Sequence, residues 1–104
     1  MEVIDIEQLI IDTAEEYGVD PQKALAVARC ESNLEVDVQS YHLRPDGSRE
    51  QSYGLWQIFL PAHPTVTREM AIDPEWSTRW AMEHLKEDRW SMWTCSKITG
   101  ALPK

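Results

Sequence analysis

Apolar side chains recur at helical spacing in the N-terminal part of the chain. The face that they form consists of Ile6, Leu9, Ile10, Ala14 and Tyr17, with Glu and Gln side chains opposite. Asp5 and Gln8 have the spacing of a capping box, and Gly18 is a typical left-handed stop. The pattern therefore predicts a helix over residues 6–17.

A second helix is predicted from Asp20-Pro21, an N-cap followed by Pro at the first helical position. It should run from Pro21 to about Ser32, with an apolar stripe at Ala24, Leu25, Val27 and Ala28. Glu31 lies three and four residues beyond the last two of these. A carboxylate is therefore expected on the face of the helix that should be buried.

The segment 35–51 is polar and has no helical period. Asp46-Gly47 indicates a turn, and its flanks are able to pair as a short hairpin. The run 54–59 is mostly apolar, so it should be buried on at least one side. Pro61 and Pro64 bracket a loop or a single helical turn.

Asp73-Pro74 repeats the start signal and predicts a third helix over about 74–89. Its inner stripe would contain Trp76, Trp80, Ala81 and Leu85. Residues 90–95 should form a short last helix, and Ile98, Leu102 and Pro103 a final packed turn. With no repeat or linker visible, we expect one mainly α-helical domain over residues 1–104.

The charge limits the classes of partner. A formal net charge of −8 disfavours nucleic acid, whose binding requires Lys and Arg on phosphates, and opposes adhesion to anionic surfaces. No apolar run has the roughly 18 residues of a membrane span, so we expect no membrane insertion. The N-terminus is acidic where a signal peptide is basic, so no export signal is expected.

Cysteines and histidines give no sign of a metal site or of another cofactor. His42, His63, His84 and the two Cys show no zinc-ligand spacing, and there is no Gly-rich phosphate loop. Cys30 and Cys95 fit two interpretations, as buried free thiols or as one disulfide joining the central helix to the C-terminus.

Glu31 is the main candidate for chemistry. A carboxylic acid in an apolar pocket retains its proton to higher pH, and glycosidases use such a group to protonate the leaving glycosidic oxygen. The alternative is structural: Glu31 pairs with Arg29 or Arg89, or it ends the helix in water.

The residues around Glu31 resemble a known pattern. Glu31-Ser32-Asn33-Leu34 followed by Gly54-Leu55-Trp56-Gln57-Ile58 is similar to the paired signature of the lysozyme-like superfamily, most closely that of soluble lytic transglycosylases. Asp46-Gly47-Ser48, Tyr53-Gly54 and the late Trp-x-x-Trp beside a Cys also resemble c-type lysozymes. The resemblance covers residues 21–95.

This resemblance implies a mainly α, lysozyme-like fold with a short hairpin or loop segment lining the cleft. It implies cleavage of the β-1,4 bond between N-acetylmuramic acid and N-acetylglucosamine in peptidoglycan, with Glu31 as general acid and base. It also favours the Cys30–Cys95 bridge. The expected partners are peptidoglycan strands or chitooligosaccharides bound by a monomer, which reaches the wall by secretion, in the periplasm or with a phage.

The chain departs from the family pattern at two places. Where c-type lysozymes carry a second carboxylate, this chain has Ser52, which favours transglycosylase chemistry, or an inverting hydrolysis with Asp46 or Glu50 as base. The later Tyr that holds the catalytic Glu in transglycosylases is also missing. Trp90, Trp93 or Tyr53 would have to replace it.

Substrate-binding roles follow from the same comparison. Gln57 should hydrogen-bond sugar substituents, Ser40 and Ser52 are rival polar contacts, and Tyr53 is a further candidate. Trp56 is expected to stack on a sugar or to pack in the core, whereas Trp76 and Trp80 are assigned to the core. A sugar-binding module without turnover and a helical protein-interaction domain remain alternatives.

Overall fold

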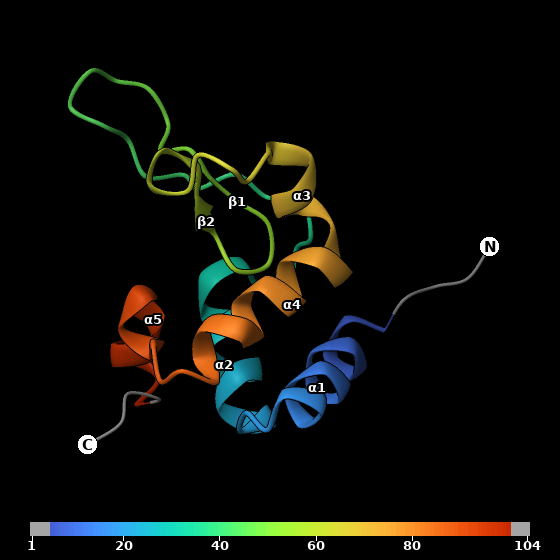
Figure 1. The fold of residues 1–104 in the computed structure, drawn as a ribbon. Helices are drawn as coiled ribbons and strands as arrows, with labels where there is room; N and C mark the ends of the chain where they lie inside the picture. The colour runs from blue at the N-terminus through green and yellow to red at the C-terminus, as the bar shows by residue number, and fades with distance from the viewer. Residues whose placement is uncertain (1–4, 101–104) are drawn as a thin grey trace.

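The computed structural model describes residues 5–100. In Figure 1, α1 packs against both α2 and α4, and the small β-sheet with its long loop lies beyond these helices. The elements in chain order are α1 (Ile6–Tyr17), α2 (Pro21–Ser32), β1 (Ser52–Tyr53), β2 (Ile58–Phe59), the 3-10 helix η1 (Leu60–Ala62), α3 (Arg68–Ile72), α4 (Pro74–Leu85), the 3-10 helix η2 (Trp90–Met92) and α5 (Thr94–Ile98). The fold is therefore mainly α-helical, as the sequence predicts.

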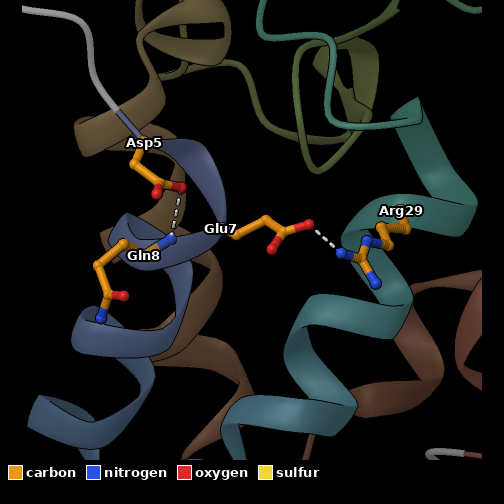
Figure 2. Close-up of polar contacts among 4 residues, drawn as sticks. All are labelled: Asp5, Glu7, Gln8 and Arg29. Atoms are coloured by element: carbon orange, nitrogen blue, oxygen red, sulfur yellow. Dashed lines mark hydrogen bonds and ion pairs between the residues drawn. The ribbon is translucent and has the colours of Figure 1, made fainter.

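Local capping explains where α1 begins and ends. The Asp5 carboxylate accepts a hydrogen bond from the Gln8 backbone N–H at 3.1 Å (Figure 2), but the Gln8 side chain donates to Asp12 instead of reaching back. Only half of the predicted capping box is formed. Gly18 ends the helix at a φ of 72°, as expected.

Helices α2 and α4 both begin at an Asp-Pro pair, as predicted. The Asp20 carboxylate accepts from two backbone N–H groups of the first turn of α2, and Asp73 does the same for α4. The predicted end of α4 at residue 89 is wrong. The helix stops at Leu85, because the chain turns at Asp88, whose φ is 61°.

The hydrophobic core lies between α1, α2, α4 and the segment 55–58. Trp56 is completely buried at its centre, and the Trp93 indole N–H donates to the Trp56 carbonyl oxygen at 2.7 Å. The inner face of α4 is rotated from the prediction, because Ser77, Thr78 and Met82 are buried with Ala81 and Leu85. Trp76 and Trp80 are half-buried and pack against the edge of the core.

The segment 38–59 forms a two-stranded antiparallel sheet and a projecting loop (Figure 1). Ser52 pairs with Phe59 and Tyr53 with Ile58, while Leu43 pairs with Arg49 across the Asp46-Gly47 turn. The sequence therefore predicts this turn and its paired flanks correctly.

Gly54 allows the sheet to contact α3. Its φ is 81°, and a Cβ added there would lie 2.0 Å from the Ala71 carbonyl oxygen. Only glycine fits this close approach of two backbones.

The C-terminal helix α5 packs beside the end of α2. A disulfide joins Cys30 to Cys95, with their Cα atoms 5.8 Å apart. The expected packed turn at Ile98 is wrong, because this side chain is 71% exposed; Leu102 and Pro103 lie outside the described residues. Within residues 5–100, no helix has the length and apolar character needed to cross a membrane.

Candidate active site

Glu31 lies in the last turn of α2 and is half-buried. Burial raises the pKa of its carboxyl group, and the negative charge of Glu50 raises it further, while a hydrogen bond from the Cys95 backbone N–H acts in the opposite direction. Among the described residues, Glu31 forms no ion pair. Arg29 pairs with Glu7 on α1 (Figure 2), and Arg89 pairs with Glu87 at 3.3 Å.

The structural alternative for Glu31, pairing with Arg29 or Arg89, is therefore wrong for this structure. The two arginines that were candidate partners form ion pairs with Glu7 and Glu87 instead. Glu31 is therefore a partly desolvated acid without an ion-pair partner among the described residues, an environment that raises the pKa and favours a proton donor.

The backbone turns sharply where α2 ends, two residues after Glu31. Asn33 and Leu34 have φ values of 53° and 60°, so both adopt the left-handed conformation. This conformation is uncommon for residues other than glycine. Asn33 closes α2 with a hydrogen bond to the Arg29 carbonyl oxygen. This sharp exit places the segment 35–41 alongside Glu31, where it lines the same hollow.

The Cys95 backbone orients Glu31. Its N–H donates to the Glu31 Oε1 atom at 3.3 Å, and the disulfide holds Cys95 against Cys30, the residue before Glu31. The sequence suggested Trp90, Trp93 or Tyr53 for this task. Trp93 instead donates its indole N–H to Trp56, so a backbone group has the role that an aromatic side chain was expected to have.

Two hollows meet at Glu31. The smaller, of about 350 Å³, lies between the end of α2 and the segment 38–41. The larger, of about 550 Å³, lies between the sheet and the segment Met92–Thr94. Glu31, Ser40 and Gln57 line both, so a chain-like ligand can extend to either side of the Glu31 carboxyl group.

Gln57 shares both hollows with Glu31 and is held in a fixed orientation. Its φ is 46°, and its side-chain nitrogen donates to the carbonyl oxygens of Val38 at 3.1 Å and Gly54 at 2.9 Å. The backbone thus satisfies the amide nitrogen, as the structural interpretation of Gln57 expects. Because Gln57 also lines both hollows, its amide oxygen is the atom suited to contact a ligand.

Of the two candidate second carboxylates, only Glu50 lies in the cleft. It lines the larger hollow with Ser52, whose hydroxyl donates to a Glu50 carboxylate oxygen at 2.9 Å. Asp46 lies outside both hollows at the exposed turn, where the Ser48 hydroxyl and N–H donate to it and hold its pKa below the usual range. Asp46 is therefore a turn residue, and its candidacy as the base fails on position.

The expected polar contacts Ser40 and Ser52 both line the cleft, and the Ser40 hydroxyl accepts from the His42 backbone N–H at 3.1 Å. Tyr53 lines neither hollow. Its ring lies under the Arg68 guanidinium, 5.6 Å from the ring centroid, so the expectation that it contacts substrate is wrong for this structure.

Trp56 is also inaccessible to a ligand. Its side chain is 0% exposed, and its indole N–H donates to the Thr78 hydroxyl at 3.1 Å. Of the two expected roles, stacking on a sugar is therefore wrong for this structure, and packing in the core is confirmed. The aromatic residues that do line the hollows are Tyr41 and Phe59 on the loop and sheet, and Trp93. Sequence reasoning missed Tyr41 and Phe59, although both lie close to predicted site residues.

No group of three or more His, Cys, Asp or Glu side chains in the described part of the chain is arranged to hold a metal ion. The cleft is thus built from one isolated acid, a second carboxylate, hydroxyl groups and a fixed amide.

Comparison with known proteins gave one family. The model of the transglycosylase SLT domain family matches residues 8–93, which include Glu31, Glu50 and Gln57. Neither curated proteins nor solved structures yielded a significant match.

Proposed function

The chain belongs to the transglycosylase SLT domain family, and on this basis we propose that it is a peptidoglycan-cleaving glycosidase with Glu31 as its general acid and base. The observation that carries the proposal is the position of Glu31 between two hollows, with no cation partner in the described chain and with a raised pKa. The substrate is the glycan strand of peptidoglycan, at the β-1,4 bond between N-acetylmuramic acid and N-acetylglucosamine.

In the first step, protonated Glu31 donates its proton to the glycosidic oxygen. The bond from this oxygen to the anomeric carbon breaks, and the N-acetylglucosamine part leaves with a new hydroxyl group. Desolvation helps because it raises the pKa of Glu31, so the carboxyl group stays protonated to higher pH than an exposed Glu does. The Cys95 N–H stabilises the carboxylate that remains after the proton has left.

In the second step, a hydroxyl group of the muramic acid attacks its own anomeric carbon and returns a proton to Glu31. The product is an anhydro-muramyl end, and no water is consumed. A single carboxyl group suffices for this route. It agrees with Ser52 at the place where c-type lysozymes have a second acid.

A hydrolase with inverting chemistry is the second candidate, and Glu50 favours it. This carboxylate shares the larger hollow with Glu31, and the Ser52 hydroxyl holds it in place. Glu50 would activate a water molecule that attacks the anomeric carbon from the opposite side, which yields a reducing end.

The test combines activity with product analysis on purified peptidoglycan. Glu31→Gln should abolish release of soluble muropeptides, while Glu15→Gln, at an exposed position on α1, should retain wild-type activity. Mass spectrometry of the products separates the two routes, since anhydro ends identify a transglycosylase and reducing ends a hydrolase. Turnover by folded Glu31→Gln would contradict the assignment of the acid.

Binding of chitooligosaccharides by the wild-type chain without any product would instead indicate a sugar-binding module that lacks turnover. The glycosidase proposal would then be wrong, although the cleft would still be a saccharide site.

A further inference from the structure

Tyr41 is unusually exposed for an aromatic residue at a cleft. Its side chain is 77% exposed, and the residue lines the smaller hollow together with Glu31 and Gln57. Core packing does not account for this position, because the nearby loop projects away from the helices (Figure 1).

A cation covers one face of the Tyr41 ring. The Arg49 guanidinium carbon lies 4.7 Å from the ring centroid, which is within the range of a cation–π contact. Arg49 is itself fixed by two hydrogen bonds, from Nε to the Ser40 carbonyl oxygen at 3.0 Å and from Nη2 to the Gln39 carbonyl oxygen at 2.7 Å. The exposed Tyr41 ring is therefore held by Arg49, whose own position is fixed by the backbone.

The two strands of the loop strengthen this arrangement. Leu43 and Arg49 form an isolated antiparallel bridge, and the Glu50 N–H donates to the His42 carbonyl oxygen at 2.8 Å. Tyr41 and Arg49 are thus on paired segments of backbone. Holding the ring in advance lowers the entropy that would be lost when a ligand orders it.

The chemistry of the exposed ring face points to one kind of ligand. The guanidinium group donates to two backbone carbonyl oxygens and covers the other ring face, and the net charge of −8 disfavours an anionic ligand. A sugar ring presents a face of C–H groups with polar groups at its rim, and it can lie against an aromatic face while the rim contacts polar atoms. Ser40 and Gln57 supply such atoms in the same hollow.

We propose that Tyr41, held by Arg49, is the stacking platform of a sugar-binding subsite in the smaller hollow, on one side of the bond that Glu31 cleaves. The ligand is an N-acetylated hexopyranose unit of a β-1,4-linked strand. This inference rests on the proposed function for the identity of the strand, but it concerns binding and is testable without turnover.

The experiment measures binding of chitohexaose by isothermal titration calorimetry in the full chain carrying Glu31→Gln, which prevents cleavage. Tyr41→Ala should raise Kd about 5-fold to 10-fold, the loss expected for one aromatic contact. Tyr41→Phe should stay within about 2-fold of the parent, because it retains the ring face. Arg49→Met should weaken binding to a smaller extent, since it removes the support but leaves the ring.

Leu43→Ala provides the matched control. Leu43 is 61% exposed on the same loop but lines neither hollow, so its removal should leave Kd unchanged. Circular dichroism should show native helix content for every variant, because the side chains of Tyr41, Leu43 and Arg49 are all exposed.

Two results would overturn the inference. Tyr41→Ala binding as tightly as Leu43→Ala would exclude stacking, and Tyr41→Phe binding as weakly as Tyr41→Ala would assign the effect to the hydroxyl group. Absence of chitohexaose binding to the parent would also overturn it. Peptidoglycan cleavage by the wild-type chain is measured separately, so Tyr41-dependent binding without cleavage would support the subsite and contradict only the proposed glycosidase activity.

Discussion

Removal of the Cys30–Cys95 disulfide should reduce both stability and activity, and the two effects are separable. The bond joins residues 65 apart in sequence. On the loop-entropy model, a cross-link of that span stabilises the folded state by roughly 4 kcal/mol. Small domains have a total stability of about 5–15 kcal/mol, so the Cys30→Ser, Cys95→Ser variant should remain folded only at low temperature.

The effect on activity follows from the contact at Glu31. The Cys95 N–H lies 3.3 Å from the Glu31 carboxylate and lowers its pKa, and the disulfide holds that N–H in place. Without the tether, we expect the hydrogen bond to be lost for much of the time. The pKa of Glu31 should then rise further, and kcat should fall about 10-fold or more, because a charge-assisted hydrogen bond contributes roughly 1.5–3 kcal/mol.

The assay compares this variant with Ile10→Ala, which destabilises the core from α1 and leaves the Cys95 contact intact. Ile10 is completely buried, and a cavity at such a position costs about 2–5 kcal/mol. Both variants are assayed on purified peptidoglycan at a temperature where circular dichroism shows each to be folded. Equal activities would refute the positioning role of the disulfide and would leave it a purely structural element.

Three further predictions concern the sheet and the ionisation of Glu31. Gly54→Ala should lower the free energy of unfolding by more than about 2 kcal/mol in denaturant titrations, because its Cβ would meet the Ala71 carbonyl oxygen, whereas Gly47→Ala, with open space around it, should cost about 1 kcal/mol. Equal losses of stability in the two variants would show that the positive φ, and not the contact with Ala71, determines the cost of adding a Cβ. Because folding raises the pKa of Glu31, the stability that its protonated form contributes is present below the unfolded pKa and is lost as pH rises through the folded pKa. Glu31→Gln should therefore be more stable than the wild type at pH 7 but not at pH 3, which thermal unfolding at the two pH values checks; Glu50→Gln should lower the Glu31 pKa, seen as a shift of its carboxyl NMR titration.

The sequence predicted best the elements whose limits depend on local chemistry. Asp-Pro and Gly signals act within a turn of the helix, and α1 and α2 have the predicted bounds. Helix α3 was missed because it is short, and its cap at Thr67 lies in a segment whose polar residues resemble a loop. The chain turns away after α4 at Asp88, which has a left-handed backbone conformation. Because Asp does not by itself demand this conformation, the sequence does not reveal where the helix ends.

Within the site, periodicity predicted the position of Glu31, because the face of a helix follows from residue spacing alone. Periodicity did not show that Trp56 is buried in the core while Tyr41 is exposed at the cleft. An apolar run predicts burial on one side, but only the fold decides which aromatic ring is covered by α4 and which remains at the cleft. The partner of Glu31 was not predictable either, since it is a backbone N–H from the other end of the chain.

The distance in sequence between Glu31 and Cys95 also limits the order in which the parts of the cleft come together. The segment 31–57 contributes two walls from one stretch of chain, but the third wall, Met92–Thr94, and the Cys95 N–H follow it by more than thirty residues. During synthesis, α1, α2 and the sheet are made before this third wall, so the cleft around Glu31 is incomplete until the C-terminal part of the chain follows. The hollow around Glu31 is therefore complete only when α5 docks beside α2, so the active site should mature with the last step of folding.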